Sequence, residues 1–212
     1  MNKLKIKICG LKNIQTIDHC INKGVNYFGL IFYKKSPRYV NIDLALKLLN
    51  HTKYKNISAV GVFVDEPISN LKDIIIKTNL NYIQLHGKED NEYIKNLKNN
   101  FDLKIIKCLK IENKNDLKKM NEFTNADYYL FDYKSEKHEL PGGNAKSFNW
   151  SLLKGEKINK PWFISGGINI NNIEEIRKKL SPYGIDISSG VEEKPGIKSM
   201  NKISKLIEKL NV

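Results

Sequence analysis

The stretch "LKIKICG", residues 4–10, alternates apolar and polar side chains in the manner of a β-strand. Three apolar residues fall on one parity, and Lys5, Lys7 and Cys9 fall on the other. Because successive strand side chains point to opposite faces, one face of this strand is apolar and the other carries two amines and a thiol. A buried strand of this kind needs partners for its charges, which the rest of the fold must supply.

Seven further runs rich in β-branched or aromatic residues follow along the chain. They span residues 27–32, 59–64, 81–86, 104–109, 128–132, 162–165 and 185–189. Segments with helical spacing lie between them, with capping residues such as Asn13, Asp43 and Asn172 near their starts. Alternating strands and helices predict a parallel sheet covered by helices, and eight units are the number that closes a (β/α)8 barrel.

The chain shows no change of composition that would mark a linker, so we expect one domain that spans residues 1–212. The helical signal is weakest in residues 111–123, and residues 134–148 form a long polar run. No G-x-G-x-x-G follows the first strand and no G-x-x-x-x-G-K-[ST] occurs, which disfavours an open nucleotide-binding sheet.

The composition, with 41% hydrophobic and 28% charged residues, is ordinary for a globular protein. No stretch approaches the roughly 18 uninterrupted apolar residues of a membrane span, and "MNKLKIKICG" lacks the apolar segment of a secretory signal. Cys9, Cys20 and Cys108 are widely spaced and form no C-x-x-C pair, so their spacing suggests neither a disulfide framework nor a zinc site. We therefore expect a cytoplasmic protein without a membrane partner.

A formal net charge of +13 raises the question of nucleic-acid binding. Only Arg38 and Arg177 are arginines, and the lysines are scattered rather than gathered with aromatic residues into a basic stripe. Such a pattern is typical of solvated helix faces, and a diffuse positive potential suits an anionic small molecule. We expect no nucleic-acid partner.

In a (β/α)8 barrel the chemistry lies where the strands end and the following loops begin. The residues at those places provide a thiol, an imidazole, carboxylates, an arginine and two glycine-containing turns. They are Cys9, Gly10, Phe32 to Arg38, Asp65, His86, Gly87, Asp132, Ser165 to Gly167 and Ser188 to Gly190. The polar parity of residues 4–10 is therefore expected to face the barrel interior, with Cys9 at its top.

These residues lie in motifs that resemble those of the phosphoribosylanthranilate isomerases of tryptophan biosynthesis. The motifs are "KICGLKN" (7–13), "GLIFYKKSPRYV" (29–40), "VGVFV" (60–64), "IQLHG" (83–87), "LFD" (130–132), "PGGNAKSFNW" (141–150), "FISGGI" (163–168) and "DISSGVEEKPGIK" (186–198). They occur in the family's order near the expected strand ends and cover essentially the whole chain. Each motif is weak evidence by itself, whereas the ordered set is specific.

The resemblance implies a single (β/α)8 barrel that catalyses an Amadori rearrangement with neither a metal nor an organic cofactor. The substrate would be N-(5-phosphoribosyl)anthranilate, and the product 1-(2-carboxyphenylamino)-1-deoxyribulose 5-phosphate. One acid must protonate the furanose ring oxygen, and one base must remove the proton from C2. The resemblance assigns these roles to Asp132 and Cys9, although in isolation the thiol could be a packing residue and the carboxylate a loop cap.

Both groups need a tuned pKa, because an unperturbed Asp has a pKa of about 3.9 and a Cys about 8.5. Lys7 lies two residues before Cys9 on the same face, and a cation there would favour the thiolate. Asp186 is the expected partner of Lys7, since strand eight neighbours strand one when a barrel closes; we count both among the substrate-binding residues. Burial near a developing thiolate would raise the pKa of Asp132.

Arg38 offers a planar guanidinium fork for the benzoate carboxylate, and His86 is expected to contact substrate hydroxyls. A surface arginine and a structural imidazole are the alternatives. The loops after strands seven and eight suit the phosphate, because glycines allow close backbone approach and exposed N–H groups favour an anion; tight turns are the alternative. The residues expected to bind phosphate are Gly166, Gly167, Ser189 and Gly190.

The loop after strand six departs from the family's pattern, Gly-Gly-x-Gly-Lys-x-Phe-Asp-Trp. Ala145 and Asn149 stand in place of the third glycine and the aspartate. Because alanine cannot adopt a positive φ as cheaply as glycine, loop closure is the step that this departure affects. The aromatic anchors Phe148 and Trp150 remain.

Other functions stay open from the residues alone. A ribulose-phosphate epimerase would need metal-binding His and Asp residues at its strand ends, and this chain has only His86 there. An aminoaldose isomerase of histidine biosynthesis would carry a carboxylate in place of Cys9, and a basic nucleic-acid-binding protein is the third alternative. The sequence also leaves open the oligomeric state and an association with other enzymes of tryptophan biosynthesis.

Overall fold

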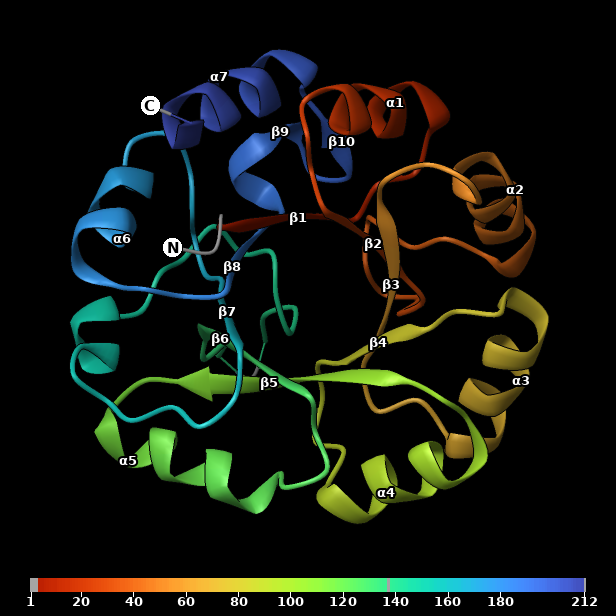
Figure 1. The fold of residues 1–212 in the computed structure, drawn as a ribbon, viewed down its shortest axis with the longest axis horizontal. Coiled ribbons are helices and arrows are strands. Elements are labelled where there is room, and N and C mark those ends of the chain that lie inside the picture. Colours follow the sequence, from red (N-terminus) through yellow and green to blue (C-terminus); the bar gives the residue numbers. More distant parts are fainter. Residues whose placement is uncertain (1–3, 137, 212) are drawn as a thin grey trace.

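The computed structural model, which describes residues 4–136 and 138–211, contains a closed barrel of eight parallel strands (Figure 1). The strands are β1 (Lys5–Cys9), β2 (Tyr27–Ile31), β3 (Ser58–Phe63), β4 (Tyr82–Leu85), β5 (Lys104–Ile111), β6 (Tyr128–Tyr133), β7 (Trp162–Ile164) and β8 (Gly184–Ile187). Each expected run overlaps one of them, and β8 pairs with β1 to close the ring. The predicted (β/α)8 barrel is confirmed.

Helices surround the ring of strands (Figure 1). They are α1 (Ile14–Asn22), α2 (Ile42–Thr52), α3 (Ile68–Thr78), α4 (Asn91–Asn100), α5 (Lys114–Leu117), α6 (Ile173–Lys179) and α7 (Met200–Asn211), with the 3₁₀ turns η1 (Lys118–Glu122), η2 (Trp150–Leu153) and η3 (Ser189–Val191). Asn13 caps α1 as predicted, because its side chain accepts a hydrogen bond from the N–H of Thr16. The cap of α2 is Asn41, and Asp43 lies inside the first turn of that helix.

The alternating pattern of β1 separates two cores. Ile6 and Ile8 belong to the large outer core between the sheet and the helices. Lys7 and Cys9 point the other way, into the ring, where Lys7 is fully buried and bonded to Asp186 of β8. A second, smaller cluster fills the ring with Tyr27, Val60, Ile106, Cys108, Leu130 and Phe163. The predicted orientation of the first strand is confirmed.

The two stretches with weak helical signals contain little helix. Residues 111–123 include α5, a single turn closed by a capping box between Asn113 and Asp116, followed by η1. The described residues between β6 and η2 form a long loop. Its end is anchored by Phe148 and Trp150, which are buried, and Asn149 caps η2 by accepting a hydrogen bond from the N–H of Ser151.

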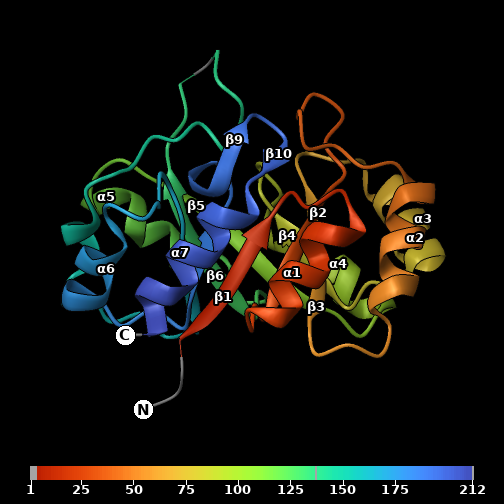
Figure 2. The same ribbon diagram turned by 90° about the horizontal axis from the view of Figure 1, so that it is seen from above.

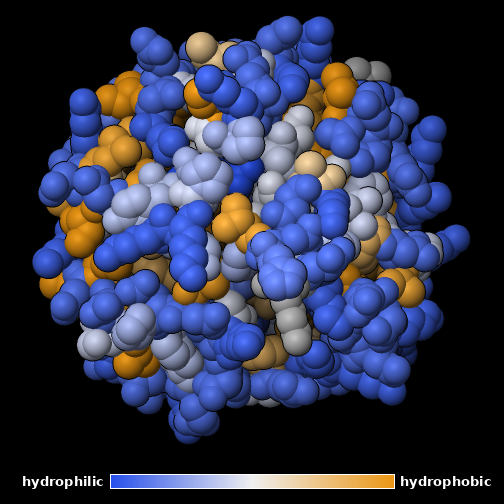
Figure 3. Space-filling view, turned by 180° about the vertical axis from the view of Figure 1, so that it is seen from behind, coloured by the Kyte–Doolittle hydropathy of each residue, from blue (hydrophilic) through white to orange (hydrophobic). Residues whose placement is uncertain are grey.

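The two ends of the barrel differ in what extends from them. At the end where the strands finish, the β6–η2 loop and the hairpin of β9 (Glu192–Lys194) and β10 (Ile197–Lys198) project, whereas β1 begins at the opposite end (Figure 2). We name the first end the mouth and the second the floor. Seen from the side opposite to Figure 1, the surface is mostly hydrophilic, with hydrophobic side chains in small separate patches (Figure 3). None of the helices in the described residues has the length and apolar character needed to span a membrane.

Candidate active site

Two adjoining cavities open at the mouth. The first is lined mainly by residues of β1 to β4, of the loops after β2, β3 and β4, and of the β6–η2 loop, and the second mainly by residues of the loops after β6, β7 and β8. The walls that the two cavities share are Asp132, Gly142, Gly143, Ser165, Asp186 and Ser188. The two cavities therefore meet at these residues.

Cys9 is the last residue of β1 and lines the first cavity. Gly29 of β2 gives the thiol its room, because a Cβ atom there would lie 2.6 Å from the Cys9 sulfur. Burial raises the pKa of the Cys9 thiol above its ordinary value and outweighs the lowering effect of Lys7. Lys7 thus acts on Cys9 in the expected direction, but it does not bring the pKa of the thiol below its ordinary value.

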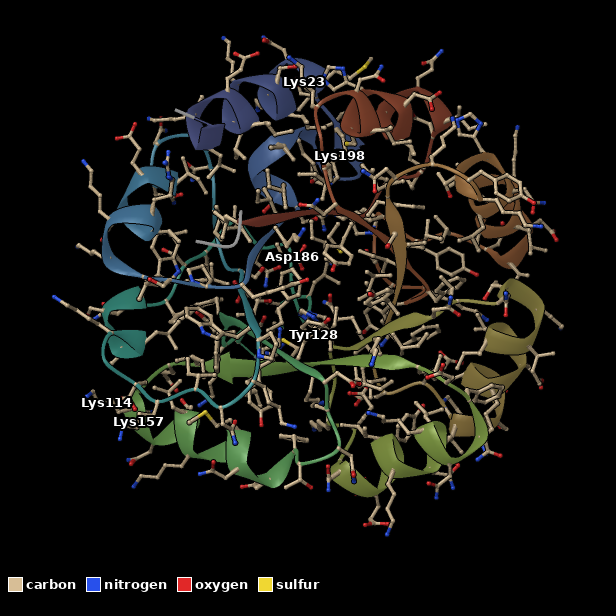
Figure 4. All side chains as sticks on the ribbon, in the orientation of Figure 1. Lys23, Lys114, Tyr128, Lys157, Asp186 and Lys198 are labelled. Carbon is tan, nitrogen blue, oxygen red and sulfur yellow. The ribbon has the colours of Figure 1, made fainter. Side chains whose placement is uncertain are left out.

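Lys7 and Asp186 form the ion pair that closure of the barrel predicts. They are register partners on β1 and β8, and Lys7 Nζ lies 2.9 Å from Asp186 Oδ2. The Asp186 carboxylate acts on the pKa of Cys9 in the opposite direction to Lys7 and so adds to the effect of burial. Asp186 lies within the ring of strands (Figure 4), where it lines both cavities. Its Oδ1 is buried and has no hydrogen-bond partner among the described residues.

Asp132 lies near the end of β6 between two nitrogen-bearing side chains. Its Oδ2 is 3.1 Å from Lys110 Nζ and 3.1 Å from His86 Nε2. Burial raises the pKa of the Asp132 carboxyl group, but Lys110 and His86 outweigh burial and hold this pKa well below its ordinary range. The expected rise in pKa is wrong, because Lys110 of β5, which no motif marks, lies beside the carboxylate.

His86 follows β4 and lines the first cavity. Its Nδ1 lies 2.8 Å from the side-chain nitrogen of Gln84, and its Nε2 lies 2.7 Å from Lys110 Nζ. Both ring nitrogens are therefore engaged by the protein. The imidazole is fixed beside Asp132, where a substrate hydroxyl would meet the pair together.

Arg38 lies in the loop after β2 and is buried in the wall of the first cavity. Its Nε and Nη2 donate to the two carboxylate oxygens of Glu192, at 2.8 and 2.7 Å. That edge of the guanidinium is occupied, so the free two-pronged fork expected for a substrate carboxylate is not present there. None of the described residues accepts a hydrogen bond from Nη1, which leaves this nitrogen for a ligand.

The β9–β10 hairpin stabilises the mouth through hydrogen bonds to Arg38 and to the loop after β8. Lys198 Nζ donates to Glu192 Oε1 at 2.8 Å and to the carbonyl oxygen of Ser188 at 2.9 Å. Ser188 Oγ in turn donates to the carbonyl oxygen of Cys9 at 3.1 Å. Burial lowers the pKa of Lys198, which opposes the effect of its carboxylate partner. Sequence reasoning missed these hydrogen bonds, since nothing in the motif marks the pairing across the hairpin.

A hydrophobic wall lines the first cavity together with Arg38. It is formed by Ile31 at the end of β2, by Val62 of β3 and Val64 just after it, and by Leu140 of the β6–η2 loop. Because alternate residues of a strand face the interior, the inward parity of β2 and β3 would have identified the first three. The wall suits a flat apolar group.

Three of the four residues expected to bind phosphate line the second cavity, namely Gly166, Gly167 and Ser189. Gly166 and Gly167 have φ values of 86° and 64°, and their N–H groups donate to no backbone acceptor in the described part of the chain. Gly190 serves packing instead, because a Cβ atom there would lie 1.9 Å from the carbonyl oxygen of Ile168. Because Gly190 has no side chain, the loop after β8 can pack directly against the backbone of the loop after β7.

Two asparagine side chains stabilise the turn after β7. Asn169 and Asn172 each donate a side-chain hydrogen bond of 2.9 Å to the carbonyl oxygen of Gly167. Asn172 stands at the N-cap position of α6, as predicted, but its side chain makes no capping hydrogen bond. It fixes the orientation of the turn that lines the cavity.

The β6–η2 loop lies across the mouth. The carbonyl oxygen of Pro141 accepts a hydrogen bond from Lys110, and that of Gly143 accepts one from Arg38 Nη2 at 3.3 Å. Gly142 must be small, because a Cβ atom there would lie 2.8 Å from His86 Nε2. Ala145 adopts a φ of 58°, the left-handed conformation that favours glycine. The loop reaches its position despite the alanine.

Comparison with known proteins gives a consistent result. The model of the family "N-(5'phosphoribosyl)anthranilate (PRA) isomerase" matches residues 6–209. The N-(5'-phosphoribosyl)anthranilate isomerase of Rhizobium etli is 39% identical over 97% of this chain and 93% of its own length. That of Thermoanaerobacter pseudethanolicus is 40% identical over 98% of both chains.

Solved structures of phosphoribosyl anthranilate isomerases also superpose on this chain over nearly its whole length. The phosphoribosyl anthranilate isomerase of Thermotoga maritima superposes with a TM-score of 0.88 at 28% identity, over 98% of both chains. A second solved structure, of a phosphoribosyl anthranilate isomerase in complex with reduced 1-(o-carboxyphenylamino)-1-deoxyribulose 5-phosphate, superposes with a TM-score of 0.82 at 26% identity, over 98% of both chains.

Proposed function

Because the chain belongs to the N-(5'-phosphoribosyl)anthranilate isomerase family, we propose that its two cavities bind one molecule of that substrate from end to end. The protein is an aldose–ketose isomerase of tryptophan biosynthesis. The observation that carries the proposed arrangement is the position of Cys9 and Asp132, between a buried guanidinium at one end and two glycine turns at the other.

The carboxyphenyl group occupies the first cavity. Its ring packs against Ile31, Val62 and Val64, and its carboxylate accepts a hydrogen bond from Arg38 Nη1. Because Glu192 fixes the other edge of the guanidinium, Arg38 meets the substrate already oriented. A charge-assisted hydrogen bond inside a buried site is strong enough to select a carboxylate at this position.

The phosphate occupies the second cavity, on the N–H groups of Gly166, Gly167 and Ser189, while Gly190 keeps the two loops together. Exposed backbone N–H groups attract an anion without a charged side chain. The ribose lies in the section that both cavities share, where Asp186 Oδ1 accepts a hydrogen bond from a hydroxyl group. The ion pair with Lys7 fixes the position of that carboxylate.

The reaction needs one proton transfer to the ring oxygen and another from C2, two atoms that are both bonded to C1. Asp132 gives a proton to the furanose ring oxygen, the bond between that oxygen and C1 breaks, and C1 and the nitrogen form an iminium. The Cys9 thiolate then removes the proton from C2, and the electron pair forms the C1–C2 double bond of the enolamine. Tautomerisation gives the aminoketose. General acid and base steps of this kind each contribute about 10²- to 10⁴-fold in rate.

The resting protein holds its protons the other way round. Burial keeps the proton on Cys9, and Lys110 with His86 keeps Asp132 ionised, although burial opposes it. The reactive form is therefore a minority species in which one proton has moved from the thiol to the carboxylate. Between the two pKa values its population does not depend on pH, because each increase in thiolate is matched by a loss of protonated carboxyl.

The cytoplasm is the compartment we infer, and three free cysteines in the described residues support it. A direct assay tests the proposed function: the purified protein is mixed with phosphoribosylanthranilate, and the fluorescence of the substrate is followed. We expect the fluorescence to disappear in a protein-dependent manner as the carboxyphenylamino ketose forms. Absence of turnover by folded protein would contradict it.

A further inference from the structure

Three buried side chains beneath the mouth bring metal-binding atoms together. His86 Nε2, Cys108 Sγ and a carboxylate oxygen of Asp132 all lie within 4.8 Å of one another. Sγ is 3.7 Å from Nε2, and Nε2 is 3.1 Å from Asp132 Oδ2. His86 follows β4, Cys108 lies within β5 and Asp132 lies near the end of β6, and these three strands are neighbours in the barrel.

The separations suit one metal ion. A tetrahedral zinc ion with Zn–S of about 2.3 Å and Zn–N or Zn–O of about 2.0 Å needs its ligand atoms about 3.3 to 3.6 Å apart. Two of the three separations, 3.7 and 3.1 Å, bracket that range, and the third, between Cys108 Sγ and the Asp132 carboxylate, is at most 4.8 Å. A thiolate, an imidazole and a carboxylate are also the three ligand types that zinc takes in proteins. The fourth position faces the first cavity, which His86 and Asp132 line.

A cation already lies near the point where the three residues converge. Lys110 Nζ is 2.7 Å from His86 Nε2 and 3.1 Å from Asp132 Oδ2. A quarter of its side chain is exposed, so the lysine can turn outward without crossing the core. Lys110 therefore competes with a metal ion for the same two ligand atoms.

The orientation of His86 also fits a metal ligand. When Nε2 binds a metal ion, the imidazole carries its single proton on Nδ1, and the nearest atom to Nδ1 is the side-chain nitrogen of Gln84. Gln84 is buried, and its Oε1 has no hydrogen-bond partner in the described residues. Turning this amide over gives Nδ1–H an acceptor. A metal-binding histidine held by a carbonyl oxygen at its other nitrogen is the usual arrangement.

We propose that His86, Cys108 and Asp132 form an inhibitory binding site for a thiophilic divalent metal ion such as Zn²⁺. The inference rests on the proposed function, in which Asp132 is the acid. On binding, Cys108 loses its thiol proton to solvent, Lys110 turns outward, and Asp132 binds the metal through its carboxylate. The acid can then no longer protonate the ring oxygen, so the enzyme stops until the metal is removed.

Zinc titration of the isomerase tests the site, with each variant compared with its own zinc-free rate. Cys108→Ala should need at least about tenfold more zinc for half inhibition than the parent, because a thiolate ligand is lost. Cys20→Ala, which removes a buried thiol outside the barrel interior, should respond like the parent. Lys110→Met, which removes the competing ammonium, should need less zinc. Equal zinc responses of the parent and Cys108→Ala would overturn the proposal.

Binding of Co²⁺ gives a readout that does not depend on turnover. The parent, Cys20→Ala and Lys110→Met should show the thiolate-to-cobalt absorption band at one ion per chain, and Cys108→Ala should lack it. A band that survives in Cys108→Ala and disappears in Cys9→Ala would overturn the proposal in favour of the catalytic thiol. An inactive parent that still shows a Cys108-dependent band would refute the proposed function and leave the metal site standing.

Discussion

The mouth and the floor of the barrel interior are built from opposite kinds of side chain. Near the mouth, Lys7, His86, Lys110, Asp132 and Asp186 are buried or half-buried among one another. The floor holds a cluster of aromatic rings, formed by Tyr27, Tyr82, Tyr128, Phe163 and Tyr183, whose neighbouring centroids lie 5.4 to 6.0 Å apart. One residue of each group, Asp186 of the mouth and Tyr128 of the floor, is labelled in Figure 4.

This difference indicates that the floor contributes most to the stability of the barrel and that the mouth carries out the reaction. Buried charges cost solvation free energy even when they are paired, so the mouth contributes little to folding. Aromatic rings bury large areas and gain from edge-to-face contacts, so the floor contributes much. Substitutions at the mouth that leave no charge unpaired, such as Cys9→Ala, should therefore change turnover with little effect on stability, and substitutions at the floor should do the reverse.

The largest effect is expected at the mouth, for Cys9→Ala. Loss of the base should lower kcat by about 10²- to 10⁴-fold, because C2 must lose a proton. The melting temperature should change little. Cys20→Ala is the matched control and should turn over like the parent. A folded Cys9→Ala protein with normal kcat would remove Cys9 from the mechanism.

Phe163→Ala tests the floor. Phe163 touches the rings of Tyr27 and Tyr183 edge-to-face and is buried against Gly184, where a Cβ atom would lie 2.5 Å from its ring. Its loss should cost about 3–5 kcal/mol of unfolding free energy in urea. Below the melting temperature, kcat should stay close to the parental value. A stable Phe163→Ala protein with lost turnover would break the comparison.

Arg38→Lys should act on substrate binding. Lysine cannot hold Glu192 with two parallel hydrogen bonds and still present an N–H to a second carboxylate. We expect KM to rise about tenfold, equivalent to about 1.4 kcal/mol, with a smaller change in kcat. Arg177→Lys, on the exposed face of α6, is the control. An unchanged KM for Arg38→Lys would count against the carboxylate site.

The smallest effect is expected for Ala145→Gly. A left-handed alanine costs about 1–2 kcal/mol, and the added freedom of glycine in the unfolded chain returns part of this. The free energy of unfolding should therefore rise by up to about 1 kcal/mol. Ala126→Gly, at a buried residue without a positive φ, should lower it. A loss of stability in Ala145→Gly would show that the loop is not strained there.

The sequence predicted the features that strand alternation and barrel closure determine. The parity of residues 4–10 placed Lys7 and Cys9 inside the ring, and the adjacency of β1 and β8 gave Lys7 its partner Asp186. The hydrophobic runs located all eight strands because burial on one or both faces leaves a clear pattern. Roles of the individual site residues came from the resemblance and remain predictions.

Contacts made by lysines and loops were not predictable in the same way. Lys110 is one lysine in a chain rich in them, and only its place two residues after Cys108, on the inward parity of β5, could have marked it. Glu192 reaches Arg38 through a hairpin whose course depends on packing. The prediction of a raised pKa for Asp132 was wrong because Lys110 and His86 decide it, and the pKa of Cys9 is raised because burial outweighs Lys7.

The most direct test of the central claim is the pH profile of kcat/KM for Asp132→Asn beside that of the parent. The parent should show a broad plateau that falls at high pH, once Cys9 ionises fully and the carboxylate can no longer be protonated. Asp132→Asn should be slower by at least about 10², equivalent to about 2.7 kcal/mol, since asparagine supplies no acidic proton. Its residual rate should increase with pH and level off above the raised pKa of Cys9, without a descending limb. Parental turnover in Asp132→Asn, or a descending limb that persists, would contradict the assignment of Asp132 as the acid.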